Sequence, residues 1–562
     1  MKFEDMPLRV PSVKKVEKKV GSLIEALVNA PDEKTAYNVV KKYEKFHDDL
    51  DTDFTIISIR YSLDTTNPEY AKAQDKADEI SPLISAISNK WNKIIVKHPF
   101  RSYLEEKMGT YYFTMIENSL RCFDEKIIPD LQEENKLSSE YDKIMGSAKI
   151  EFNGETLNLS QMGKYTTSAD KKIRHDANVA LDAWMGEHEA QIGEIYGKLV
   201  KLRHEMALKL GFKNFTELGY MLLGRSDYNA EDVKGYRAQI AETVVPVCKK
   251  LYKQQAERLG MKQKDMAAYD YNCTFLDGNP KPAGDKDYLV DVATKMYDDM
   301  GPETSEFFHF MLDNNLMDLE ARAGKAPGGY MTFMPRYKAP FIFSNFNGTD
   351  GDVNVLTHEV GHALQGYLSA NIKVPEYRSP TLEACEIHSM SMEFFAWPYM
   401  EGFFKEDKDK YLRSHLEDAI KFLPYGISID EFQHWVFEHP YATHEERCAE
   451  WLRIEKAYTP HKVWKDTPTF AHGAYWIRQS HIFGVPFYYI DYTLAQVCAM
   501  QFLVEMHKDR AKAWKKYIKL CKCGGKYPFV TLLAKNHIRN PFIAGNVAKT
   551  IRPCVKILNE LK

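Results

Sequence analysis

Residues 357–366 read THEVGHALQG and contain the pattern H-E-x-x-H. Because an α-helix repeats every 3.6 residues, His358 and His362 lie one turn apart on the same face, where both imidazoles can bind one metal ion. Glu359 points to the neighbouring flank, within reach of a water molecule at that ion. The pattern therefore predicts a zinc-binding helix with Glu359 as an acid–base group.

The residues around this motif favour a helix that packs on one side. Residues 350–352 read DGD and supply turn and cap chemistry just upstream of it. Apolar residues then recur at helical spacing on the side roughly opposite the two histidines. This apolar stripe consists of Leu356, Val360, Ala363 and Tyr367.

A catalytic zinc site needs a third protein ligand and keeps one position for water. Residues 381–396 read TLEACEIHSMSMEFFA and place Glu383, Glu386 and Glu393 near one helical face. Spacing alone allows either Glu383 or Glu386 to be the ligand, and His388 is a weaker alternative. The apolar neighbours of these acids make full solvation unfavourable, so an acid in this segment needs a partner.

A histidine followed by tyrosines lies further along the chain, where residues 480–493 read SHIFGVPFYYIDYT. His481, Tyr488, Tyr489 and Tyr492 offer hydrogen-bond donors, and peptide hydrolysis develops an oxyanion that positioned donors stabilise. An aromatic core stripe would explain the same pattern, and the residues alone favour that interpretation.

The composition is that of a globular protein without a nucleic-acid or membrane partner. The 562 residues are 44% apolar and 27% charged with a formal net charge of -4, and no basic run supplies the positive patch that nucleic-acid binding needs. No segment reaches about eighteen consecutive apolar residues, so we expect no membrane span. The N-terminus lacks an apolar signal region, and the 9 scattered cysteines are odd in number, so we expect a reducing cytoplasm.

Helical patterning dominates the chain, and its length exceeds what one hydrophobic core usually supports. Residues 149–159 read KIEFNGETLNL, which is typical of a hairpin with Asn153-Gly154 at its turn. We expect a large, mostly α-helical protein with a small β element beside the zinc helix. The clearest helical stretches, with apolar residues every three or four positions, are residues 72–97, 169–210, 232–260 and 494–520.

Taken together, these segments resemble the M3 metallopeptidases. HEVGH, the run from Glu386 to Glu393 and the histidine-tyrosine segment carry the likeness, which is closer to the oligoendopeptidase F branch and its shorter Pz-peptidase-like members. The resemblance implies two helical lobes with a deep central channel, one Zn²⁺ on its floor, and short unstructured peptides as substrates. It spans residues 150–550 and includes the further stretches 214–233, 432–440 and 481–496.

The resemblance also implies roles for individual residues. The residues of H-E-x-x-H match the two ligating histidines and the catalytic acid. Glu386 matches the third ligand, because Ser389 and Glu393 then stand at the family's offsets. Glu393 would be a carboxylate that hydrogen-bonds to a metal ligand and does not bind the metal itself.

His481 and the tyrosines match the family's transition-state stabilisers. Relative to thimet oligopeptidase, the distance from His481 to the tyrosines is one residue longer. Tyr489 and Tyr492 keep the family's three-residue spacing and are preferred as the transition-state stabilisers. Tyr488 is an alternative stabiliser, and if it does not have that role we expect it to contact substrate.

Residues 339–347 read APFIFSNFN and are predicted to form an edge strand beside the zinc helix. Substrate backbone would add to this strand and contact Ser344 and Asn345. Gly328 and Gly329 would let another chain approach closely, although an ordinary loop explains them equally well.

We expect residues 1–190 to form an N-terminal helical region of one lobe and residues 191–562 to form the catalytic region. The predicted activity is zinc-dependent hydrolysis of internal bonds in short peptides. A dipeptidyl carboxypeptidase of related fold is an alternative, which needs a group to hold the C-terminal carboxylate of the substrate. An inactive peptide-binding scaffold is a second alternative, against which the retained ligands and Glu359 argue. Oligomeric state, side-chain preference and physiological substrate stay open.

Overall fold

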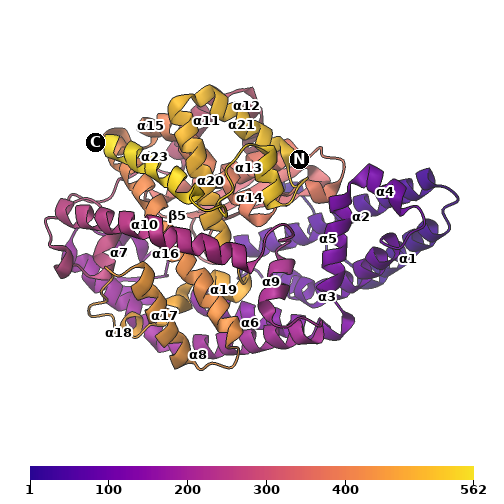
Figure 1. The fold of residues 1–562 in the computed structure, drawn as a ribbon, viewed down its shortest axis with the longest axis horizontal. Coiled ribbons are helices and arrows are strands. Elements are labelled where there is room, and N and C mark those ends of the chain that lie inside the picture. Colours follow the sequence, from indigo (N-terminus) through magenta and orange to yellow (C-terminus); the bar gives the residue numbers. More distant parts are fainter. Residues whose placement is uncertain (562) are drawn as a thin grey trace.

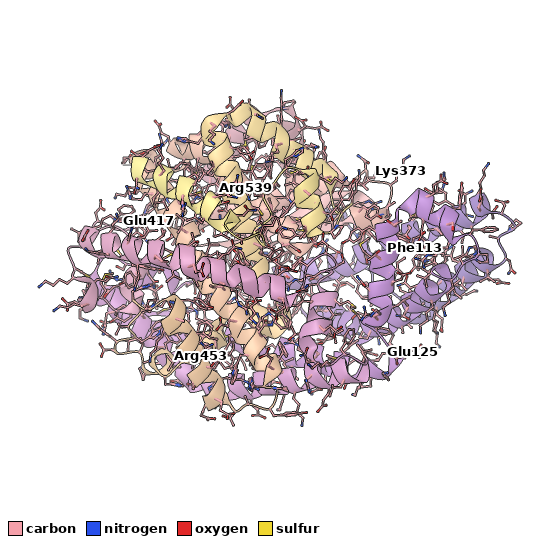
Figure 2. The ribbon with its side chains drawn as sticks, viewed as in Figure 1. Phe113, Glu125, Lys373, Glu417, Arg453 and Arg539 are labelled. Atoms are coloured by element: carbon pink, nitrogen blue, oxygen red, sulfur yellow. The ribbon has the colours of Figure 1, made fainter. Side chains whose placement is uncertain are left out.

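The computed structural model describes residues 1–561, and its N-terminal helices form a bundle with its own hydrophobic core. Within this core Trp91 stacks on Tyr43 with ring centroids 4.0 Å apart, and Phe113 (Figure 2) is buried beside them. In Figure 1 the bundle extends to one side of the molecule. It consists of α1 (Val13–Val28), α2 (Glu33–Leu63), α3 (Pro68–Ile95), α4 (Arg101–Met108) and α5 (Thr110–Arg121).

The other helices share a second, larger hydrophobic cluster and lie in an upper and a lower group in Figure 1. The upper group contains α11 (Lys286–Met300), α12 (Pro302–Asp313), α13 (Gly351–Ser369), α14 (Leu382–Phe395), α15 (Met400–Phe404), α20 (Tyr489–Lys508), α21 (Arg510–Cys523) and α23 (Asn546–Glu560). The lower group contains α6 (Ile128–Gly146), α8 (Lys171–Lys209), α17 (His444–Tyr458), α18 (Pro468–Ala471) and α19 (Ser480–Gly484).

Long helices connect these two groups. Helix α16 (Lys408–Glu438) contacts α20 in the upper group and α17 in the lower group. Between the groups in Figure 1 also lie α9 (Phe215–Leu222) and α10 (Ala230–Arg258). The chain further contains the short helices α7 (Gly163–Thr166) and α22 (Phe529–Lys535). The prediction of a mostly α-helical fold is confirmed.

Most of the predicted helical stretches are confirmed as single helices. Residues 494–520 are the exception, because α20 ends and α21 begins at Asp509. Asp509 has extended backbone angles, and its side chain accepts a hydrogen bond from the main-chain nitrogen of Lys512, which caps α21. The predicted division at residue 190 falls inside α8. No helix among the described residues is both long and apolar enough to cross a bilayer.

The described residues form two small sheets. Strand β1 (Ile150–Phe152) pairs antiparallel with β2 (Glu155–Leu157), which confirms the predicted hairpin. Asn153 and Gly154 have positive φ angles of 51° and 78°, as a two-residue hairpin turn requires. The second sheet has the order β3-β5-β4 and contains β3 (Met317–Glu320), β4 (Tyr330–Met334) and β5 (Ala339–Phe346).

The prediction of an edge strand at residues 339–347 is wrong. Strand β5 lies in the middle of its sheet, parallel to β3 on one side and antiparallel to β4 on the other. Its residues from Ala339 to Ser344 are all buried. A continuous apolar run such as APFIF is typical of a strand covered on both faces, whereas a half-exposed strand alternates. The two outer strands of this sheet are β3 and β4.

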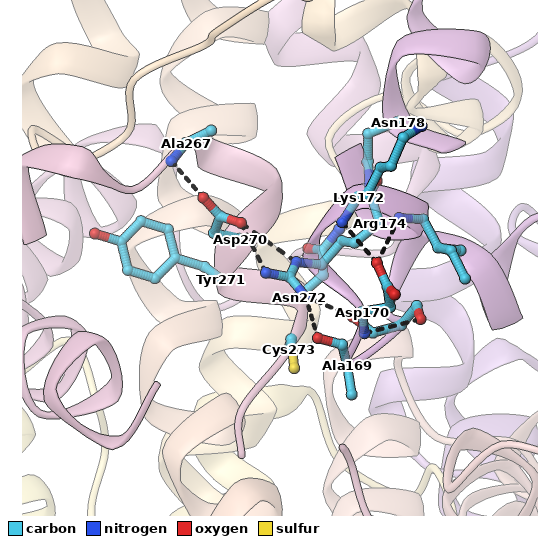
Figure 3. Close-up of polar contacts among 12 residues, drawn as sticks. Ala169, Asp170, Lys172, Arg174, Asn178, Ala267, Asp270, Tyr271, Asn272 and Cys273 are labelled. Atoms are coloured by element: carbon cyan, nitrogen blue, oxygen red, sulfur yellow. Dashed lines mark hydrogen bonds and ion pairs between the residues drawn. The ribbon is translucent and has the colours of Figure 1, made fainter. Parts of the chain in front are cut away.

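A buried ion pair fixes the segment after α10 against the start of α8. Arg174 donates from Nη2 to Oδ1 of Asp270 at 2.8 Å, and the two side chains are 3% and 1% exposed. Oδ2 of Asp270 accepts from the main-chain nitrogen of Ala267 at 2.8 Å, and Arg174 also reaches the carbonyl of Ala169 (Figure 3). These bonds hold the short 3-10 helix η4 (Ala268–Asn272) in the wall of a polar cavity.

Removing one partner of this pair is expected to destabilise the protein strongly. Asp270→Ala leaves the Arg174 guanidinium buried without its counter-ion, which typically costs about 3–5 kcal/mol. Urea unfolding should show a corresponding fall in the free energy of unfolding. The control is Lys172→Ala, which removes an exposed pair with Asp176 on the same helix and should change stability little. Equal stability of the two variants would contradict the importance of the buried pair.

Candidate functional site

Helices α13 and α14 bring His358, His362 and Glu386 together. The Nε2 atoms of the two histidines lie 3.2 Å and 3.4 Å from one oxygen, Oε2 of Glu386. All three ligand atoms fall within 4.8 Å of one another. In a tetrahedral zinc site with bonds of about 2.0–2.1 Å, neighbouring ligand atoms lie roughly 3.4 Å apart. The spacing of this group therefore fits a single metal ion.

The structure separates the three alternatives for the third ligand. Glu383 is 1% exposed, and it interacts with Arg225 and Tyr228 and not with the two histidines. His388 is fully buried, with its ring near that of Tyr517. Glu386 is the acid of this helix that lies beside both histidines.

Gly361, between the two histidines, permits the close approach of α14 to α13. A Cβ atom at this position would lie 2.7 Å from Cα of Ser389 and 2.8 Å from the carbonyl oxygen of His388. Ser389 in turn donates from Oγ to Oε2 of Glu386 at 2.9 Å. The tight contact between the helices thus sets the position of Glu386, and Ser389 orients its carboxylate.

A chain of hydrogen bonds supports His358 from behind. Glu393 places Oε1 2.7 Å from Nδ1 of His358 and Oε2 2.7 Å from Nε2 of His415. Trp397 donates from Nε1 to Nδ1 of His415 at 3.0 Å, so neutral His415 carries its proton on Nε2. Glu393 then accepts from both histidines, which leaves the Nε2 lone pair of His358 free to bind a metal ion.

Glu359 lies beside the ligands but outside the group of three. It is 7% exposed, and its Oε2 atom has no hydrogen-bond partner among the described residues. Burial raises the pKa of Glu359, and His358 and His362 offset part of this effect. For Glu386, burial is outweighed by the same two histidines, which hold its pKa well below the ordinary value. The two carboxylates are thus tuned differently, one to take up a proton and one to stay ionised.

His481 and the tyrosines lie across the site from α13. Tyr488 donates to Oε1 of Glu386 at 2.5 Å, and Nε2 of His481 is 3.2 Å from the Tyr492 hydroxyl. Gln479 donates from Nε2 to Nδ1 of His481 at 2.7 Å, so the histidine proton lies on Nε2. Burial lowers the pKa of His481 to about 4, which keeps the ring neutral. Burial also raises the pKa of the tyrosines, which keeps their hydroxyl groups protonated.

Tyr489 occupies a different position from the other two tyrosines. Its ring centroid lies 5.8 Å from those of Phe422 and Tyr425, in an adjoining aromatic group. Tyr488 and Tyr492 are one helical turn apart with ring centroids 4.8 Å apart, and both interact electrostatically with Glu386. The hydroxyl groups nearest the ligands are therefore those of Tyr488 and Tyr492.

A cavity of about 360 Å³ opens beside these residues. Its walls include His358, Glu393, His481, Tyr489 and Tyr492. A second cavity of about 320 Å³ shares two wall residues with it, Asp418 and Phe422. The two cavities are neighbours along α16, and we refer to them together as the cleft.

The remaining predicted residues support the sheet beside α13. Ser344 is 3% exposed within β5. Asn345 donates to the carbonyl groups of Ala326 and Gly328 at 2.9 Å and 2.8 Å, so it holds the loop that precedes β4. Gly328 has a φ of +90°, and Gly329 lies against the main chain of β5, where a Cβ atom would meet a carbonyl oxygen at 3.4 Å.

The sequence did not indicate several residues that shape the site. Gly361 could have been found from the sequence, because a glycine inside H-E-x-x-H indicates that another segment packs closely against the helix at that point. The others come from distant segments and meet the site only through tertiary contacts, and they are Trp397, His415, Tyr425 and Gln479.

Two family models match almost the whole chain. Residues 3–123 match the model described as Peptidase M3 N-terminal domain, and residues 164–549 match the model described as Peptidase family M3.

Individual relatives agree with these matches. The chain is 22% identical over 523 residues to the oligoendopeptidase F homolog of Borreliella burgdorferi, covering 88% of this chain and 85% of that protein. A solved structure of PZ peptidase A with inhibitor 2 is 44% identical, with a TM-score of 0.98 and coverage of 100% of both chains. A structure from Bacillus anthracis, provisionally described as an oligoendopeptidase F, is 43% identical with a TM-score of 0.93, covering 100% of this chain and 99% of that chain.

Gly361→Ala is expected to disturb the ligand group without removing a ligand. The new Cβ atom would lie 2.7 Å from the main chain of Ser389, and such overpacking costs typically about 1–3 kcal/mol. The variant should unfold at a lower temperature and should retain less metal after dialysis against a weak chelator. The control is Gly351→Ala on the same helix, where a Cβ atom would meet only the Thr349 side chain, at 3.2 Å. Normal metal retention in Gly361→Ala would argue against the proposed positioning of Glu386.

Proposed function

The chain belongs to peptidase family M3, and from this premise we propose that it is a zinc-dependent endopeptidase that cuts internal bonds of short, unstructured peptides. The observation that carries the proposal is the convergence of His358, His362 and Glu386 beside the unpartnered oxygen of Glu359. Two imidazoles and one carboxylate are the donor set of catalytic zinc sites that keep a position for water.

The proposed reaction assigns a proton transfer to Glu359. Zinc, when bound, lowers the pKa of water at its open position and polarises the peptide carbonyl. Oε2 of Glu359 accepts the proton of the attacking water and passes it to the leaving nitrogen. The raised pKa of Glu359 suits this exchange, because the carboxyl group must hold the proton between the two steps.

Tyr492 is the best-placed donor to the developing oxyanion. Its oxygen accepts the Nε2–H of His481, so its own proton is available to donate to a substrate oxygen in place of the neighbouring Tyr488 hydroxyl. Tyr488 instead donates to Oε1 of Glu386, which leaves Oε2 to face the two histidines. In this assignment His481 positions Tyr492, Tyr488 positions the third ligand, and Tyr489 forms part of the cavity wall.

The cleft supports a size limit on substrates. An extended peptide can lie along the two adjoining cavities, whereas a folded protein would have to unfold to reach the ligands. Since β5 is covered on both sides, the substrate backbone would pair with the outer strand β4.

One observation favours the second candidate, a dipeptidyl carboxypeptidase. Arg478 lies in the wall of the second cavity, which shares Asp418 and Phe422 with the cavity beside His358, and it forms no ion pair with a carboxylate among residues 1–561. Its guanidinium donates to the Tyr475 hydroxyl at 3.0 Å. A guanidinium without a carboxylate partner in this cavity could hold the C-terminal carboxylate of a bound peptide.

Mass spectrometry of a defined peptide mixture tests the proposed activity. Peptides of roughly five to twenty residues, with free and amidated C-termini, should be cut at internal bonds, because a short extended backbone fits the cleft. A chelator should stop the cleavage, and zinc should restore it. Glu359→Gln should keep its zinc and lose at least about 10²-fold in kcat. The matched control is Glu205→Gln, in the His204-Glu205 pair of α8, which should cleave normally.

Two results would overturn this assignment. Release of C-terminal dipeptides from free-acid peptides alone would show a dipeptidyl carboxypeptidase. Cleavage of no peptide by the zinc-loaded protein would reject both activities.

A tyrosine series tests the assignment of the oxyanion donor. Tyr492→Phe removes one hydroxyl and keeps the ring, so it should lower kcat by about 10²–10³-fold with KM nearly unchanged. Tyr488→Phe should instead weaken zinc binding, because Glu386 loses a hydrogen bond. Tyr489→Phe is the control with little expected effect. A large loss of kcat in Tyr489→Phe but not in Tyr492→Phe would contradict the assignment of Tyr492 and would make Tyr489 the oxyanion donor.

A further inference from the structure

A second group of metal-type ligands lies in the lower half of the molecule, outside the site described above. It consists of Glu189 on α8 and of His444 and Cys448 on α17. His444 and Cys448 are one helical turn apart, so both side chains project from one face. Over residues 1–561, the sets of three such donors within 4.8 Å of one another are this group and the His358 group.

The distances within the second group are close to those of a zinc site. Nε2 of His444 lies 2.7 Å from Oε1 of Glu189 and 3.5 Å from Sγ of Cys448. With zinc bonds of about 2.3 Å to sulfur and 2.0–2.1 Å to nitrogen, tetrahedral ligands lie roughly 3.5 Å apart. His472 lies outside this group of three, and its Nε2 atom is 3.0 Å from the other oxygen of Glu189. To admit an ion, only the His444 imidazole and the Glu189 carboxylate, which are 2.7 Å apart, would need to separate slightly.

Two glycines allow the segments that carry these donors to meet. A Cβ atom on Gly193, one turn after Glu189, would lie 2.5 Å from Nδ1 of His444. Gly473 follows His472 directly and has a φ of +106°, and a Cβ atom there would lie 2.2 Å from the carbonyl oxygen of Cys448. Any side chain at either position would push a donor away from the group.

We propose that Glu189, His444 and Cys448 bind a second divalent ion of the zinc class. A thiolate and an imidazole select zinc or its borderline neighbours over the hard ions Mg²⁺ and Ca²⁺, which prefer oxygen ligands. Cys448 is 2% exposed, while the side chain of His472 is 51% exposed, so the ion would be reached from one side.

The place of the group, away from Glu359 and the His358 group, indicates a structural site. His472 would complete four protein ligands if its ring moved toward the other three donors. The ion would tie α8 and α17 to the segment that leads through η9 (Ala474–Arg478) to His481. It would thereby stabilise the part of the cleft wall that carries Arg478, independently of the reaction at Glu359.

Cobalt substitution distinguishes the two sites. The protein should be stripped of metal, loaded with Co²⁺ and freed of excess ion. We expect about two ions per chain and a thiolate-to-cobalt charge-transfer absorption, which only the Cys448 site can produce because the His358 group has no sulfur. Cys448→Ser should lose this absorption and one ion, unfold at a lower temperature and still cleave peptides. Cys523→Ser is the control and should keep the absorption.

His358→Ala provides the reciprocal measurement, because it should lose the other ion and keep the thiolate absorption. One ion per wild-type chain without charge-transfer absorption would overturn the proposal, and would show that the four side chains form a hydrogen-bonded cluster only. The same conclusion follows if the absorption persists in Cys448→Ser. Since the wild-type spectrum and metal count decide the question alone, poor folding of a variant would not obscure it.

Discussion

The contact between α13 and α14 at Gly361 is the constraint on which the candidate active site depends. The two histidines are fixed relative to each other by one turn of α13, but the third ligand comes from a separate helix. Glu386 reaches them because the missing side chain of Gly361 lets the main chain at Ser389 come close. The candidate site is thus a property of helix packing, and H-E-x-x-H supplies only two of its three proposed metal ligands.

Hydrogen-bond chains then orient the side chains that this contact brings together. The chain from Trp397 through His415 and Glu393 directs the Nε2 lone pair of His358 toward the ligand group. On the opposite side, Gln479 fixes the proton of His481 on the nitrogen that faces Tyr492. Burial keeps the His481 ring neutral and the Tyr492 hydroxyl protonated, so this side of the site needs little reorganisation when charge develops during peptide hydrolysis.

The same packing positions the two adjoining cavities. Helix α16 joins the upper and lower helices, and both cavities lie along it, one of them beside His358. The sheet beside α13 contributes a covered central strand and the outer strand β4. Asn345, at the end of β5, donates hydrogen bonds to the loop before β4. The position of β4 therefore depends on β5.

The sequence by itself determined the features that depend on local periodicity and residue chemistry. It predicted the mostly helical fold, the hairpin at Asn153-Gly154 and the pairing of His358 with His362, because helical and hairpin geometry act over a few residues. Spacing left Glu383 and Glu386 equivalent, and resemblance to a family was needed to choose between them. The tertiary structure decided what long-range packing controls: the central position of β5, the approach of α14 to α13, the direction of each tyrosine hydroxyl and the chain through His415. These features join segments tens or hundreds of residues apart, and no local pattern encodes which of them will touch.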